Sequence, residues 1–96
     1  MLIELIEIKK AKDGNYMLSP IFINSLSIVY LSENTGMRFK LKEGKLNLGL
    51  NQNFTTFTDV RLNHTQGYAS TITVVGDPGL IETKIFNKQQ KQLLKG

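Results

Sequence analysis

Apolar and polar residues alternate through much of the first 75 positions of this chain, and a period of two predicts β-strands. The clearest example is the hexapeptide 37–42, Met-Arg-Phe-Lys-Leu-Lys. On a strand, successive side chains point to opposite faces, so this segment would have an apolar face and a basic face. The two sets are Met37, Phe39 and Leu41 on one side and Arg38, Lys40 and Lys42 on the other.

Turn residues divide the rest of this region into further short strands. We expect strands at about 2–10, 16–18, 26–31, 46–50, 54–62 and 69–75. Asp13-Gly14-Asn15 predicts a hairpin turn, since glycine adopts positive φ without strain. Pro20 is expected to interrupt the second strand, because proline has no N–H to donate. Glu4 shares its strand face with apolar residues, which indicates either a bulge or a second buried face.

The period changes after Val75, where a helix is predicted at about 79–94. Asp77 suits an N-cap and Pro78 suits the first helical position, where a missing N–H costs nothing. Two stripes follow at helical spacing, one apolar and one basic: Ile81, Ile85, Phe86 and Leu93, and Lys84, Lys88, Lys91 and Lys95.

Together these elements predict a mostly β (α+β) fold in a single domain over residues 1–96. We expect a small antiparallel twisted sheet or barrel of six to seven short strands, closed by one C-terminal helix. Open strand edges invite aggregation, so this many strands predicts either closure or pairing with a second subunit.

Composition narrows the class of protein. The chain has 96 residues, 41% of them hydrophobic, which is ordinary for one globular domain. It has no cysteine, which excludes disulfides and thiolate chemistry and fits a cytoplasmic location. The apolar N-terminus is interrupted by Glu4 and Glu7, so neither a signal peptide nor a membrane anchor is expected. The net charge of +4 permits a polyanionic partner, or simply a well-solvated surface.

Residues for catalysis are scarce. The single histidine, His64, lies beside a turn, and Asp59 five positions earlier is not expected to orient it. No carboxylate pair or metal-ligand spacing is present, so we predict no enzyme activity, no metal and no cofactor. The loop 76–79 leads into the predicted helix but lacks the glycine spacing of phosphate-binding loops, and helix capping explains it better.

The predicted basic strand is the candidate anion site. Arg38, Lys40 and Lys42, with Lys45 beyond the next turn, are expected to contact phosphates of a nucleic acid or nucleotide-type ligand. The aromatic residues available to stack on bases are Tyr30, Phe57 and Tyr68. The alternative is that these cations only protect an exposed strand from edge-to-edge aggregation.

Residues 51–58 form an uncharged segment with two aromatic residues. It is a candidate interface strand between subunits, with Phe54, Thr56 and Phe57 at the contact, because no charge there prevents pairing. It is equally consistent with an ordinary strand of this domain.

Two regions resemble the small FlbD-type flagellar proteins and short phage and bacterial chains of similar pattern. The first is 2–28, with its Asp-Gly turn, Tyr16-Met17-Leu18 and Ile23-Asn24-Ser25-Leu26-Ser27-Ile28. The second is 72–81, Ile-Thr-Val-Val-Gly-Asp-Pro-Gly-Leu-Ile. This resemblance implies a small Sm- or SH3-like barrel without an active site. The Lys- and Asn-rich composition also suits a small phage-encoded protein.

These observations predict a non-enzymatic, self-associating binding protein whose basic strand faces an anionic ligand. The competing interpretation is a structural or interaction protein, such as a virion component or an inhibitor that docks on a host protein, with no nucleic-acid ligand.

Overall fold

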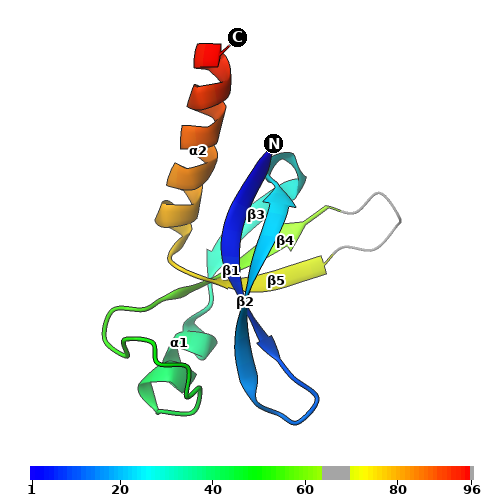
Figure 1. Ribbon diagram of the computed structural model, residues 1–96. Helices are drawn as coiled ribbons and strands as arrows, with labels where there is room; N and C mark the ends of the chain where they lie inside the picture. Colours follow the sequence, from blue (N-terminus) through cyan, green and yellow to red (C-terminus); the bar gives the residue numbers. More distant parts are fainter. Residues whose placement is uncertain (64–69, 96) are drawn as a thin grey trace.

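The computed structural model describes residues 1–63 and 70–95, with residues 88–95 as helical backbone only (Figure 1). In chain order its elements are β1 (Leu2–Lys10), β2 (Tyr16–Asn24), a 3-10 turn (Ser25–Ser27), β3 (Ile28–Glu33), α1 (Thr35–Lys42), β4 (Phe57–Leu62), β5 (Ser70–Val75) and α2 (Pro78–Lys95). The strands form one antiparallel sheet in the order β2-β1-β5-β4-β3. The α+β class is confirmed. The predicted barrel, the six to seven strands and the single helix are wrong, because the described residues form five strands in an open sheet with two helices.

β1 and β2 form a long hairpin that is paired in continuous register from Leu2↔Asn24 to Lys10↔Tyr16. The predicted turn is present: Gly14 has a φ of 89°, and the Asn15 N–H donates to Asp13 Oδ1 at 3.0 Å. β2 continues through Pro20, contrary to the predicted interruption. β2 is an edge strand with β1 on one side only, and proline is tolerated in such strands.

β1 has a second buried face, which is one of the two alternatives that the position of Glu4 indicated; the other was a bulge. Ile3 and Leu5 are buried on one face, and Ile8, which has the opposite parity, is buried on the other. The hairpin crosses the rest of the sheet, meeting β5 in register only at Glu7↔Val74. The two halves of β1 therefore pack into different cores.

The larger core lies between the sheet and α2, and we call it the α2 core. Its buried members come from the hairpin, β4, β5 and α2: Ile3, Leu5, Ile23, Val60, Leu62, Val74 and Ile81. The smaller core lies under α1 and the loop that follows it, and we call it the α1 core. Its buried members are Ile8, Leu41, Leu46 and Phe57.

Residues 37–42 are helical, so the predicted basic strand is wrong. Asn34 caps α1, since its side-chain Oδ1 accepts a hydrogen bond from the Met37 N–H at 2.9 Å. Met37 and Leu41, four residues apart, pack into the α1 core. Phe39 was expected on the same buried face, yet it is 64% exposed because helical geometry turns it away.

The predicted strand at 46–50 is also absent, and these residues form a loop between α1 and β4. Gly44, Asn47 and Gly49 all have positive φ, of 75°, 49° and 71°, which an extended strand does not allow. The alternating leucines nevertheless contribute to the hydrophobic core. Leu46 is buried in the α1 core, and Leu48 and Leu50 pack against it.

The C-terminal helix is confirmed and begins at Pro78, one residue before the predicted bound, with proline in the first helical position as expected. Asp77 caps it, because its Oδ1 accepts a hydrogen bond from the Leu80 N–H at 2.8 Å. Ile81 is buried in the α2 core and Ile85 packs against it, whereas Phe86 is 56% exposed. The first turns of α2 therefore dock on the sheet, and Figure 1 shows the rest of the helix extending beyond it.

Candidate anion-binding site

Basic residues concentrate at the end of the molecule formed by the hairpin turn and α1, which lie side by side in Figure 1. Seven of the twelve Lys and Arg residues belong to these segments: Lys9, Lys10, Lys12, Arg38, Lys40, Lys42 and Lys45. Four acidic residues accompany them: Glu7, Asp13, Glu33 and Glu43. We call this region the basic end. It carries most of the net positive charge of the chain.

Three of these cations are paired with carboxylates. The N···O distances are 3.7 Å for Lys9–Glu7, 3.8 Å for Arg38–Glu33 and 3.6 Å for Lys45–Glu43. Two of the predicted anion ligands, Arg38 and Lys45, are therefore partly neutralised within the chain. Within residues 1–63 and 70–87 no ion pair involves the other four, Lys10, Lys12, Lys40 and Lys42.

Two of these four lysines converge on one tyrosine. Lys40 Nζ, from α1, donates to the Tyr16 hydroxyl oxygen at 3.0 Å and lies 5.5 Å from the centre of its ring. Lys10 Nζ, from the end of β1, lies 5.8 Å from the same centre. Both distances are within the range of cation–π attraction. We call Lys10, Tyr16 and Lys40 the Tyr16 cluster.

The arrangement changes the acidity of the phenol. The hydrogen bond from the Lys40 ammonium is the main cause that lowers the pKa of Tyr16 below its ordinary value of 10.0. The positive charges of Lys40 and Lys10 add to this effect, and desolvation opposes it.

Sequence reasoning missed Lys10 and Tyr16 as site residues, although a signal for that half of the cluster was present. The two residues flank the Asp13-Gly14-Asn15 turn, and a hairpin in the observed register makes them cross-strand partners. The approach of Lys40 carried no such signal, because it depends on the docking of α1 beside the hairpin.

The helix distributes the predicted basic residues over two sides. Arg38 and Lys42 are four residues apart and share one side of α1, whereas Lys40 faces the hairpin. The strand ladder that motivated the prediction is therefore absent. The lysines still lie in one region of the surface, but they are positioned by helix docking and not by strand alternation.

The residues predicted to stack on bases or to form a subunit interface differ in exposure and do not form one site among the described residues. Tyr30 is 52% exposed on β3 and Phe54 is 82% exposed in the loop before β4. Thr56 is half-buried, and Phe57 is completely buried in the α1 core, so its ring is not available to a ligand or a partner. Tyr68 and His64 lie outside the described residues.

Asp59, considered as a partner of His64, is engaged elsewhere. Its Oδ1 accepts hydrogen bonds from Asn34 Nδ2 at 2.9 Å and from Thr73 Oγ1 at 2.8 Å. The same Asn34 side chain caps α1. Asp59 therefore attaches the start of α1 to the middle of the sheet, which places Lys40 relative to the hairpin.

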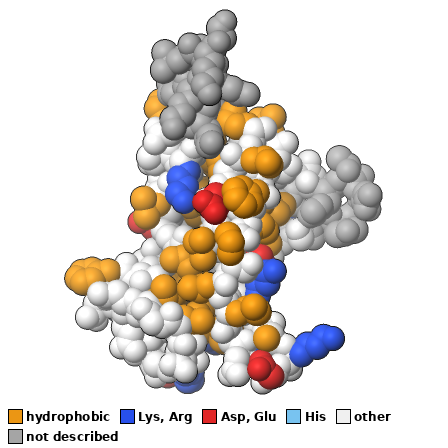
Figure 2. Space-filling view, in the orientation of Figure 1, with side chains coloured by type: hydrophobic (Ala, Val, Ile, Leu, Met, Phe, Trp, Pro, Cys, Tyr) orange, Lys and Arg blue, Asp and Glu red, His pale blue; other side chains and the backbone are white. Residues whose placement is uncertain are grey.

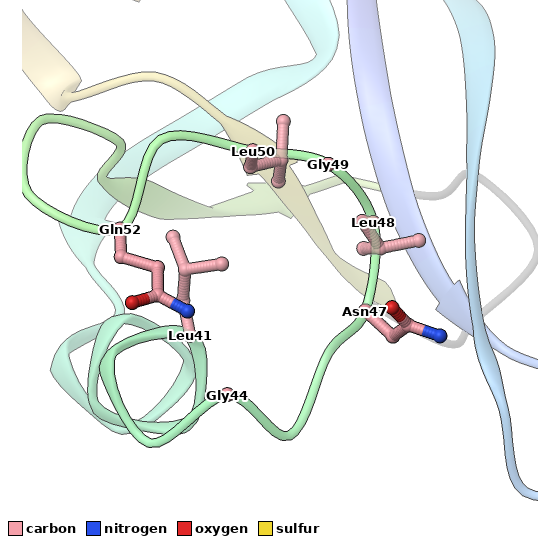
Figure 3. Close-up of a pocket in the computed structure, with 7 residues that line it drawn as sticks. All are labelled: Leu41, Gly44, Asn47, Leu48, Gly49, Leu50 and Gln52. Atoms are coloured by element: carbon pink, nitrogen blue, oxygen red, sulfur yellow. The ribbon is translucent and has the colours of Figure 1, made fainter.

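A small pocket of about 180 Å³ lies in the loop after α1 (Figure 3). Its lining is three leucines, two glycines and two amides: Leu41, Leu48, Leu50, Gly44, Gly49, Asn47 and Gln52. Figure 3 shows the Gln52 amide close to Leu41, while the Asn47 amide points away from the space. The lining carries no charged side chain, so the pocket has no counter-charge for an anion.

Other site types find no support in the described residues. Residues 1–63 and 70–87 contain no group of His, Asp and Glu that could hold a metal ion. None of the described helices is long and apolar enough to cross a membrane. Compared with known proteins, the chain matches no family model, no curated protein and no solved structure.

Proposed function

We propose that the protein is a non-enzymatic, self-associating binding protein that holds an anionic ligand, a nucleic acid or a nucleotide-type molecule, at its basic end. The observation that carries the proposal is the Tyr16 cluster. Two lysines from segments far apart in the chain meet at one ring, and no carboxylate of the described residues pairs with either. Like charges brought together without a counter-ion are suited to an external anion.

The cluster offers three hydrogen-bonding groups to an anionic ligand: two ammonium groups and one phenol. Each ammonium donates directly to phosphate oxygens, as lysine does in many phosphate sites. The Tyr16 oxygen already accepts from Lys40, so its own O–H is free to donate. Lys12 in the turn and Lys42 at the end of α1 add two cations to the basic end that form no ion pair among the described residues, which favours a ligand with several phosphates over a single small anion.

The experiment is a salt titration of oligonucleotide binding, measured by fluorescence anisotropy with labelled oligothymidylate of about fifteen nucleotides, a length within the range of small binding domains. The variants are Lys10→Gln, Lys40→Gln and the double substitution. Each lysine that contacts a phosphate contributes about 0.7 to the slope of log affinity against log salt for single strands. We expect each single substitution to reduce the slope by about that amount, and the double by about twice as much.

Lys9→Gln is the matched control. Lys9 adjoins Lys10 but points to the opposite face of the hairpin and is paired with Glu7. The same change of charge there is expected to alter the slope much less. Affinity that does not depend on salt, or equal effects of the Lys9 and Lys10 substitutions, would contradict the proposed site.

Self-association is the second part of the proposal, and the sheet edges restrict how it occurs. Pro20 lies within the β2 edge, and the register of the β3 edge shifts between Ile28 and Tyr30. Both features hinder the addition of a further strand. Contact between faces is therefore the expected mode, and light scattering coupled to size exclusion measures it. A monomer at all concentrations would remove this part of the proposal.

The alternative function, a structural or interaction protein without a nucleic-acid ligand, is favoured by a different observation. On the outer side of the hairpin, Leu2, Ile6 and Phe22 are 58%, 38% and 62% exposed. Figure 2 shows hydrophobic side chains gathered along the middle of one face, over and beside the hairpin. Exposed apolar patches mark protein contacts. This alternative predicts that Phe22→Ser weakens partner binding while the lysine substitutions have no effect.

A further inference from the structure

One face of the β3–β4–β5 part of the sheet presents a tyrosine and an arginine side by side. Tyr30 on β3 and Arg61 on β4 are cross-strand partners, so their Cβ atoms lie about 5 Å apart on the same face. Tyr30 is 52% exposed and Arg61 is half-buried. The opposite face of these strands contributes Val60, Leu62 and Val74 to the α2 core.

A local irregularity places Tyr30 on this face. Ile28 pairs with Leu62, so a regular ladder would pair Tyr30 with Val60 and turn the ring into the core. The register shifts by one residue after Ile28, and Tyr30 pairs with Arg61 instead. Ile28 and Leu31 then both pack against the α2 core. Such shifts commonly re-aim a side chain next to a functional site.

The charge of this face suits bases better than phosphates. Asp59 lies two residues before Arg61 on the same face of β4, so the two opposite charges offset each other locally. Asp59 is held by Asn34 and Thr73, and Arg61 Nη1 donates to Thr71 Oγ1 at 3.3 Å. This bond holds the guanidinium on the β5 side of Arg61, across β4 from Tyr30. The exposed Tyr30 ring, with a planar guanidinium on the same face of the sheet, offers a surface on which nucleobases stack.

The Tyr30–Arg61 face lies close to α1, the helix that carries the basic end. β4 begins at Phe57, which is buried beneath α1, and Arg61 lies four residues further along the same face, about 13 Å away at the rise of a strand. Asn34 joins the two regions directly, since it caps α1 and donates to Asp59. A polymer held by lysines near α1 can therefore reach this face with its next nucleotides.

Resting on the proposed function, we infer that the ligand is a single-stranded nucleic acid and that Tyr30, supported by Arg61, stacks on one of its bases. A duplex covers the faces of its bases, whereas a single strand exposes them. Single strands are therefore expected to bind more tightly than a duplex of equal phosphate content.

The test compares Tyr30→Leu, Tyr30→Phe and the wild type on a labelled single strand and on a hairpin duplex. Loss of one stacked base weakens binding by about five- to 150-fold, so we expect Tyr30→Leu to fall in this range on the single strand only. Tyr30→Phe keeps the ring and is expected to retain binding. The slope against salt stays unchanged in both variants, since tyrosine contributes no charge. Phe22→Leu, which replaces another exposed aromatic residue, is the matched control.

The outcomes separate this inference from the proposed function. Equal affinity for single strand and duplex, or a Tyr30→Leu variant that binds like the wild type, overturns the stacking role while the lysine variants still test the basic end. Loss of binding in Tyr30→Phe as severe as in Tyr30→Leu also overturns it, because the ring is then not the contributing group. A wild-type protein that binds no nucleic acid overturns both.

Discussion

Asn34 connects the start of α1 to the sheet, and its removal tests how the basic end is positioned. In Asn34→Ala the helix loses its cap, since Asn34 Oδ1 accepts from the Met37 N–H at 2.9 Å. A lost cap costs about 1 kcal/mol. The variant also loses the 2.9 Å hydrogen bond to the Asp59 carboxylate, and a bond to a charged group contributes about 1.5–3 kcal/mol. We therefore expect a decrease in the free energy of unfolding of about 2–4 kcal/mol.

Urea denaturation followed by circular dichroism measures this change. Asn24→Ala is the control, because Asn24 also accepts one backbone N–H, that of Leu26 at 3.0 Å, but within the described residues its side chain makes no second hydrogen bond, and it is exposed. Its expected cost is about 1 kcal/mol or less. A helix of eight residues does not persist alone, so α1 depends on these anchors. Equal costs for the two variants would refute the anchoring role of the bond between Asn34 and Asp59.

Three further predictions follow from particular contacts. Leu41 is 3% exposed in the α1 core, so Leu41→Ala is expected to lower the free energy of unfolding by about 2–5 kcal/mol in the same assay. The control Leu26→Ala, at a 76% exposed site, is expected to change it by about 0.5 kcal/mol or less. The pKa of Tyr16 is lowered chiefly by Lys40, so Lys40→Gln is expected to move the absorbance transition of the Tyr16 phenol to higher pH. Subtracting the titration of a Tyr16→Phe variant isolates this transition, and an unchanged midpoint would contradict the contact. Gly14 has a φ of 89° in the hairpin turn, so Gly14→Ala is expected to cost about 1–2 kcal/mol through backbone strain alone, and a neutral result would mean that the turn adopts another conformation.

Local signals in the sequence were sufficient for the hairpin turn and for α2. Asp13-Gly14-Asn15 forms the turn because glycine alone adopts that φ easily, and Asp77 caps the helix because its short carboxylate reaches the Leu80 N–H. In both cases the interaction that decides the structure lies within three residues. The β4 and β5 strands were likewise expected, with β4 beginning three residues later than predicted.

The segment 37–42 was misassigned because its pattern is ambiguous over such a short length. Met37 and Leu41 are separated by four residues, a spacing that fits both a strand face and a helix face. The helical conformation is stabilised by Asn34. Its side chain caps the helix and also bonds to Asp59, 25 positions away in sequence. The alternating leucines at 46–50 were ambiguous in the same way, and positive φ at Asn47 and Gly49 turns them into a loop that covers the α1 core.

The sequence by itself determined a basic, cysteine-free α+β chain with one hairpin turn and one capped terminal helix, because each of these features depends on composition or on neighbours in the chain. Only the tertiary structure decided which cations meet. Lys10 and Lys40 are 30 positions apart, and they share Tyr16 because α1 docks beside the hairpin. The one-residue shift that turns Tyr30 toward Arg61 is likewise set by the packing of Ile28 and Leu31 in the α2 core. Long-range packing sets such positions, and no local pattern encodes them.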